Sequence, residues 1–110
     1  MAYFAFMGID RIGSGPVRER SRDAHRAHLR TRHADCTFVS GGPLLDTVAG
    51  EMVGSLLIFE AASRADVERV IAGDPYILAD LFVRTELHVL HWTVGAPPAH
   101  AGSCLNKRRG

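Results

Sequence analysis

The 110-residue sequence predicts one small α+β domain, in which helices cover one face of a four-stranded antiparallel sheet. Segments rich in aromatic and branched apolar residues alternate with segments rich in helix formers. Their order is strand, helix, strand, strand, helix, short helix, strand. Glycine and proline residues separate most of these segments, which places turns between them.

The first predicted strand spans residues 2–9, where the side chains alternate loosely and include Phe, Tyr and Ile. A loop at residues 13–16 follows it. A helix is predicted over residues 17–34, because this stretch lacks Gly and Pro and is dominated by Arg, Ala, Leu and Glu. Its apolar stripe is narrow, and His25 and His28 occupy part of it. These histidines are either packing residues or the border of a polar pocket.

The next two strands differ in character. Cys36–Ser40 predicts a short strand. The glycine and proline residues at 41–43 predict the start of a loop, and we expect the chain to stay exposed to solvent as far as residue 51. Met52–Glu60 is the clearest strand, and its residues 56–59 are apolar without alternation. Both faces of this strand therefore need cover. The helices can cover one face, and we expect the sheet of a second subunit to cover the other.

The second half of the chain begins with a helix over Arg64–Ala72, for which Ser63 is a suitable N-cap and Gly73 a suitable end. Asp74 and Pro75 then begin a short helix that extends to about Leu81. In this helix the aspartate is the predicted N-cap and the proline the first helical residue.

The last predicted strand covers Arg84–Val94, and residues 96–110 form a C-terminal tail outside a domain at residues 1–95. The complete order is that of a ferredoxin-like βαββαβ sandwich. Such a sandwich has one bare sheet face, which again predicts a homodimer that forms through the sheet.

The composition excludes several classes of protein. The formal net charge is only +1, so a general nucleic-acid binder is not expected. The helix at 17–34 is nevertheless rich in arginine, which we interpret as a solvated face: Arg18, Arg20, Arg22, Arg26, Arg30 and Arg32. No apolar run approaches the roughly 18–20 residues of a membrane span. Cys36 and Cys104 are far apart and fit two free thiols, so we expect a cytoplasmic protein.

Four short motifs carry a family resemblance: Arg22-x-x-His25, Gly42-Pro43, Gly54-Ser55 and Asp74-Pro75-Tyr76. With these motifs in this order, residues 2–94 resemble the YciI-like (YCII-related) family. The resemblance implies a dimeric α/β barrel, in which two sheets pack face to face, and an active site built on a His–Asp pair.

The site residues that the resemblance implies are His25 and Asp74. The chain departs from the family pattern at Arg26, where the histidine is often followed by leucine. Here a second histidine, His28, precedes Leu29, so the register leaves two candidates. Helical spacing and the distance from Gly42-Pro43 favour His25 over His28.

The chemistry of these residue types supports a proton-transfer site. A histidine exchanges protons near neutral pH, and a nearby carboxylate fixes its tautomer. Asp74 also has a purely structural alternative, since Asp-Pro is a normal helix start. Arg22, Ser55 and Tyr76 are candidate substrate-binding residues. Their alternatives are a surface ion pair for Arg22 and simple packing for Tyr76.

The sequence thus predicts an acid–base enzyme of elimination, lyase or isomerase type that acts on a small metabolite. The alternative is a non-catalytic ligand-binding or accessory protein with the same pocket, and a second rival is a haem-using or oxygen-using barrel enzyme. We expect no metal, since the histidines lack further ligands at suitable spacing. We also expect no organic cofactor, because no phosphate-binding glycine loop follows a strand.

Overall fold

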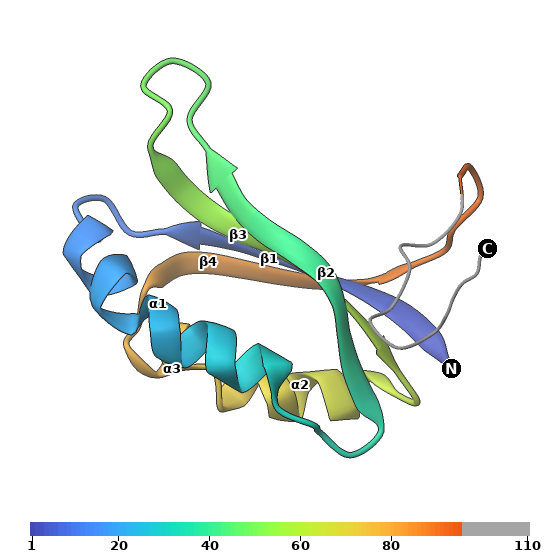
Figure 1. The fold of residues 1–110 in the computed structure, drawn as a ribbon. Helices are drawn as coiled ribbons and strands as arrows, with labels where there is room; N and C mark the ends of the chain where they lie inside the picture. The colour runs from blue at the N-terminus through green and yellow to red at the C-terminus, as the bar shows by residue number, and fades with distance from the viewer. Residues whose placement is uncertain (96–110) are drawn as a thin grey trace.

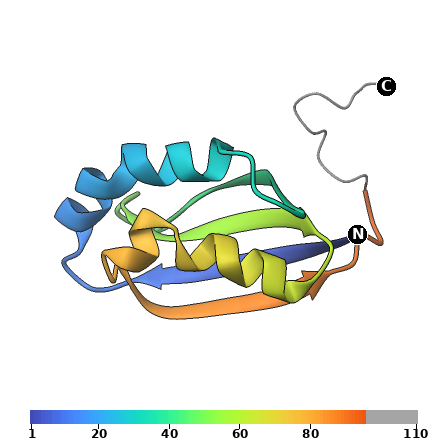
Figure 2. The same cartoon turned by 90° about the horizontal axis from the view of Figure 1, so that it is seen from below.

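The computed structural model describes residues 1–95. Along these residues it contains β1 (Ala2–Asp10), α1 (Gly15–Arg30), β2 (Cys36–Leu45), β3 (Met52–Ala61), α2 (Arg64–Ala72), α3 (Pro75–Leu78) and β4 (Phe82–Leu90). The sheet is antiparallel throughout, with strand order β2-β3-β1-β4. All three helices lie on one side of it (Figures 1 and 2). The predicted ferredoxin-like α+β fold is therefore confirmed. The predicted tail at 96–110, with Cys104, lies outside the described residues.

The core lies between the helices and one face of the sheet. Phe4 and Phe6 of β1 pair with Phe59 and Leu57 of β3, and these four side chains are at most 4% exposed. Val67 of α2 is fully buried against them. Because side chains alternate along a strand, the intervening residues lie on the opposite face.

The opposite face of the sheet is largely apolar in its two central strands, and no helix within residues 1–95 covers it (Figure 2). In β3 it presents Leu56, which is 38% exposed, and Ile58, which lies outside the core cluster. In β1 the residues at alternate positions are Tyr3, Ala5 and Met7, all partly buried. This distribution explains the continuous apolar run of β3, since each of its faces carries apolar side chains.

The first helix is shifted toward the N-terminus from its predicted span of 17–34. It begins at Gly15, because Pro16 is acceptable in the first turn, where the missing N–H would have no helical partner. It ends at Arg30, because Thr31 adopts an extended conformation. The Thr31 N–H and hydroxyl both donate to the Ala27 carbonyl, which satisfies the last turn.

The second strand is longer than the predicted Cys36–Ser40, and the prediction of a loop at residues 41–43 was wrong. Gly41, Gly42 and Pro43 stay paired with β3 as far as Leu45. An edge strand tolerates proline, since one side of the strand needs no hydrogen-bond partner. Gly41 is required here, because a Cβ atom would lie 2.4 Å from the Leu56 carbonyl oxygen.

The last strand and the short helix also differ from their predicted bounds. β4 ends at Leu90 instead of Val94, since Leu90 pairs with Tyr3 and its partner strand β1 begins only one residue earlier. The strand begins at Phe82, which pairs with Asp10. The short helix ends at Leu78 instead of Leu81.

The helix α2 agrees with its predicted bounds. The Ser63 side chain accepts a hydrogen bond from the Asp66 N–H, as an N-cap does. Gly73 follows as the C-cap, as predicted. No helix within residues 1–95 has both the length and the apolar character needed to cross a membrane.

The core position of Phe59 gives a test of this packing. Phe59→Ala should lower the free energy of unfolding by about 3–5 kcal/mol, because it removes a ring that is 1% exposed and leaves a cavity. Urea unfolding followed by circular dichroism measures the change. Val83→Ala is the control, since Val83 is 59% exposed and its loss should cost less than about 0.5 kcal/mol. Equal effects of the two substitutions would contradict the described core.

Cys36 gives a second test. Burial, together with the charge of Asp66, raises the pKa of the Cys36 thiol to about 11. At pH 8 only about one such thiol in a thousand is ionised, and the thiolate is the reactive form. In a Cys104→Ser background, the folded protein should therefore react slowly with Ellman's reagent, and the urea-unfolded protein should react fully. Rapid labelling of the folded protein would show that Cys36 is accessible.

Candidate functional site

His25 and Asp74 are 49 residues apart in the sequence and in direct contact in the fold. His25 lies in α1, and Asp74 immediately precedes α3. The imidazole Nδ1 is 2.7 Å from Oδ1 and 2.9 Å from Oδ2 of the carboxylate. The two residues are only 7% and 3% exposed. The pair is therefore a buried contact and not a surface ion pair.

Asp74 is also the N-cap of α3. Its Oδ1 accepts a hydrogen bond of 2.9 Å from the Tyr76 N–H, and Pro75 is the first helical residue. The structural role expected from Asp-Pro and the contact with His25 thus coexist in one carboxylate. Because the cap fixes the carboxylate on the main chain, it also fixes the position of the imidazole that the carboxylate holds.

Tyr76 packs flat against His25. The two rings are stacked, with centroids 3.8 Å apart and planes 13° apart. Tyr76 is 2% exposed, and the Arg18 guanidinium carbon lies 4.9 Å from the centre of its ring. The imidazole is thus held at its edge by Asp74 and across its face by Tyr76, which leaves it little freedom to rotate.

His28, the other candidate from the sequence, makes a different contact. Its Nε2 lies 2.7 Å from the Val70 carbonyl oxygen, and its ring packs beside Gly73 and His33. The histidine that faces Asp74 is therefore His25. His28 instead links α1 to the end of α2.

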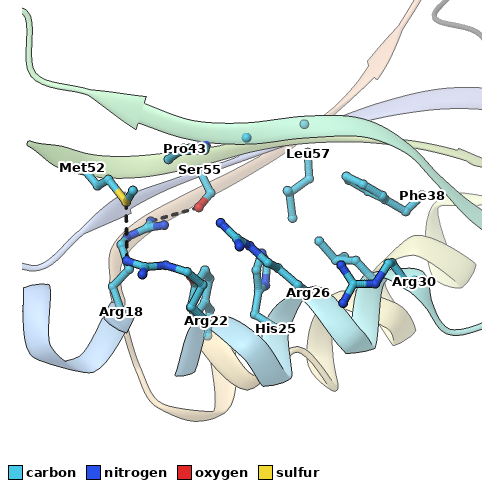
Figure 3. Close-up of a pocket in the computed structure, with 14 residues that line it drawn as sticks. Arg18, Arg22, His25, Arg26, Arg30, Phe38, Pro43, Met52, Ser55 and Leu57 are labelled. Atoms are coloured by element: carbon cyan, nitrogen blue, oxygen red, sulfur yellow. Dashed lines mark hydrogen bonds between the residues drawn. The ribbon is translucent and has the colours of Figure 1, made fainter. Parts of the chain in front are cut away.

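A cavity of about 270 Å³ lies beside His25, between α1 and the strands β2 and β3 (Figure 3). His25 lines this cavity, whereas Asp74 contacts His25 without lining the cavity itself. The imidazole Nε2 has no hydrogen-bond partner within residues 1–95, and the surrounding protein does not enclose this atom completely. Since Nδ1 is occupied by Asp74, Nε2 is the nitrogen that can meet a ligand.

Arg18 closes one end of the cavity, and its predicted position on a solvated face was wrong. The residue is 4% exposed. Its Nε and Nη2 donate to the two carboxylate oxygens of Asp10 at 2.7 and 2.8 Å, and Nη2 also donates to Ser55 Oγ at 2.9 Å. The side chains of this ion pair are 5% and 6% exposed. A positive charge and its counter-charge are thus both buried at the base of the site.

Several charges act on the pKa of Arg18. Burial lowers the pKa, but the hydrogen bonds to Asp10, the negative charge of Asp10 and the neighbouring Tyr76 raise it, and the net shift is upward. Arg18 therefore stays charged. The sequence signal that could have predicted the burial of Arg18 is helical spacing. Arg18, His25 and Leu29 follow one another at intervals of seven and four residues and form the buried side of α1.

Three further arginines of α1 line the cavity: Arg22, Arg26 and Arg30. Arg22 is partly buried, and its Nη2 donates a long hydrogen bond of 3.9 Å to the Met52 sulfur. Arg26 and Arg30 are exposed at the rim of the cavity. None of the three forms an ion pair within residues 1–95. The candidate residues Ser55 and Tyr76 line the same cavity. The structure thus brings all five predicted site residues together.

The part of the chain that the structure describes contains no group of three His, Cys, Asp or Glu side chains placed to hold a metal ion. The cavity presents imidazole, guanidinium, hydroxyl, aromatic and aliphatic side chains, the Met52 thioether, and the segment Gly41-Gly42-Pro43. These groups can transfer a proton at Nε2 and bind an anion beside it.

Comparison with known proteins gives a family and a solved relative. The model of the YCII-related domain matches residues 2–93. The solved structure of 5-chloro-2-hydroxyhydroquinone dehydrochlorinase (TftG) from Burkholderia phenoliruptrix AC1100, in complex with 2,5-dihydroxybenzoquinone, is 35% identical. That match covers 84% of this chain and 95% of the other, with a TM-score of 0.71.

A more distant structure, protein Atu4242 from Agrobacterium tumefaciens, is 17% identical, with a TM-score of 0.48. That match covers 89% of this chain and 99% of the other. No match was found among curated proteins.

The buried ion pair of Arg18 and Asp10 gives a test of the site's structure. Arg18→Met should destabilise the fold by about 3–5 kcal/mol, because it leaves the Asp10 carboxylate buried without its partner. Adding Asp10→Leu should restore much of that loss, since the uncompensated charge disappears. A double-mutant cycle measured by urea unfolding isolates this coupling. Simple addition of the two single effects would show that the residues do not interact as described.

Proposed function

The chain belongs to the YCII-related family, and from this premise we propose that it is an enzyme. Its reaction is an elimination on a small hydroxylated aromatic metabolite, with His25 as the group that transfers the proton. The observation that carries the proposal is the buried imidazole, which is held by Asp74 at Nδ1 and open to a cavity at Nε2. The relative TftG supports the reaction class, because its name describes the removal of hydrogen chloride from a chlorinated hydroxyhydroquinone.

In the proposed mechanism His25 is the general base. Because the Asp74 carboxylate can only accept, Nδ1 carries the single proton of the neutral imidazole and donates a hydrogen bond to the carboxylate, which leaves a lone pair on Nε2. When Nε2 takes a proton from the substrate, the resulting imidazolium lies against the negative charge of Asp74. Asp74 therefore sets the tautomer before the reaction and stabilises the charge that forms during it.

Nε2 of His25 first takes the proton of a ring hydroxyl, whose oxygen becomes a carbonyl, and the imidazolium returns this proton to the ring carbon that bears the chlorine, which becomes tetrahedral. Nε2 then takes the proton of a second ring hydroxyl, and the electron pair of that O–H bond forms a second carbonyl. The ring electrons shift to form a double bond at the tetrahedral carbon, and the carbon–chlorine bond breaks with both of its electrons leaving as chloride. The net change is the loss of HCl and the formation of a quinone. The imidazolium then releases its proton to solvent, which returns the enzyme to its starting state.

The remaining site residues bind or position. We assign Arg22 to an ionised hydroxyl of the substrate, since its guanidinium faces the cavity without a carboxylate partner among residues 1–95. Ser55 accepts a hydrogen bond from Arg18, so its own hydroxyl proton is available to a substrate oxygen. Tyr76 contacts the cavity but is mostly covered by His25 and Arg18, so its main role is to hold the imidazole ring in place.

The proposal includes a homodimer that forms through the bare sheet face. Leu56 and Met7 on this face are apolar and at least partly exposed, and no helix within residues 1–95 covers them. The sheet of a second copy would bury these side chains, since a matching surface is present on each copy. We also keep the cytoplasmic location that the sequence led us to expect.

The test is turnover. 5-Chloro-2-hydroxyhydroquinone is the first substrate to assay, with chloride release as the readout. His25→Asn should lower kcat by about 10²–10⁴-fold, because it removes the base. Asp74→Asn should lower kcat with a smaller change in KM and with the fold retained, since asparagine is also a good N-cap.

His28→Asn is the matched control, because His28 lies on the same helix but bonds to the Val70 carbonyl and not to Asp74. It should leave kcat within a few-fold of the original. Full activity of the His25→Asn variant would refute the assignment of the base. Saturable binding of aromatic ligands without turnover of any of them would favour the alternative, a binding or accessory protein.

A further inference from the structure

Four arginines of α1 follow one another at every fourth position and line the cavity: Arg18, Arg22, Arg26 and Arg30. The charge of Arg18 is balanced by Asp10. The other three guanidinium groups have no carboxylate partner within residues 1–95, and no Asp or Glu lines this cavity among those residues. The cavity therefore has a local excess of positive charge, although the whole chain is nearly neutral.

The helix itself offers carboxylates that these arginines do not use. Glu19 lies three residues before Arg22, and Asp23 lies three residues before Arg26, which is a spacing that commonly forms ion pairs on a helix. No such pair forms. The arginine side chains instead lie between α1 and the strands (Figure 3). An ordinary solvated helix face would not explain why they line the cavity.

The two ends of the cavity differ. Ser55 and Met52 lie at the end near Arg18, while Phe38 and Leu57 lie at the other end beside Arg30 (Figure 3). His25 lies between them. Phe38 is partly buried and Leu57 is 3% exposed, so this end offers an apolar wall to an aromatic ring. The guanidinium groups of Arg26 and Arg30, at the rim of the cavity, would meet the edge of such a ring.

We infer that the substrate carries a carboxylate as well as its ionisable hydroxyl, and that Arg26 and Arg30 bind this carboxylate. The inference rests on the proposed function, since it assigns the substrate class of the same cavity. A planar carboxylate matches the fork of a guanidinium group. The volume of about 270 Å³ is at the lower end of small-molecule pockets, which suits a single ring. The substrate class is therefore hydroxylated monocyclic aromatic acids.

A pair of probes that differ only in the carboxylate tests this inference. These are 2,5-dihydroxybenzoate and 1,4-hydroquinone, and their affinities for the full chain are measured by isothermal titration calorimetry. The chain should bind 2,5-dihydroxybenzoate at least about tenfold more tightly. The preference should shrink as salt is raised, because the arginines at the rim are exposed. Equal affinities, or no saturable binding of the carboxylate probe, would overturn the inference.

Variants then locate the subsite. Arg26→Gln combined with Arg30→Gln should abolish most of the preference and leave the affinity for 1,4-hydroquinone nearly unchanged. Arg20→Gln combined with Arg32→Gln is the control, since it removes the same charge from exposed residues that do not line the cavity. The control should retain the preference. An equal loss in both double variants would show a general charge effect and would overturn the subsite.

The same measurements separate this inference from the proposed function. Binding is also measured with His25→Asn, which lacks the proposed base. If that variant keeps the carboxylate preference while no variant shows turnover, the subsite stands and the enzyme assignment fails. If turnover depends on His25 but the preference does not depend on Arg26 and Arg30, the enzyme assignment stands and the subsite fails.

Discussion

The contact between the His25 imidazole and the Asp74 carboxylate is the interaction on which the site depends. It joins the middle of α1 to the start of α3, and both residues are almost completely buried. The same carboxylate caps α3 through the Tyr76 N–H, and Tyr76 in turn stacks on the imidazole. These three residues therefore fix one another. The capping of the short helix α3 and the orientation of the imidazole depend on the same carboxylate.

The charged residues around this contact form two sets with different roles. Arg18 and Asp10 are buried together and hold Ser55, so they set the shape of one end of the cavity with no net charge. Within residues 1–95, Arg22, Arg26 and Arg30 have no such counter-charge and leave the cavity positive. Because Arg18 and the other three arginines lie on a single helix at a spacing of four residues, α1 combines a structural and an electrostatic function.

The sequence predicted the fold because its local signals were strong and consistent. Ser63 and the Asp74-Pro75 pair have clear capping chemistry, and the bounds of α2 agreed with it. The contact of His25 with Asp74 came only from a family resemblance, since no local rule pairs residues so far apart. The role of Arg18 was missed because an arginine on a helix is normally solvated, and only tertiary packing brings Asp10 to it. The course of β2 was misjudged because Gly-Gly-Pro normally signals a loop, whereas edge pairing overrides that preference.

The strand segment Gly41-Gly42-Pro43 has a consequence for ligand size. It forms part of the cavity wall that faces α1, and two of its three residues have no side chain. This part of the wall cannot adapt by changing rotamers, since its position is set by the hydrogen-bond ladder between β2 and β3. In the proposed site, the space left for a ligand beside this segment is thus set by the register of an edge strand and not by side-chain rotamers. The proposed selection by charge depends on the helix opposite.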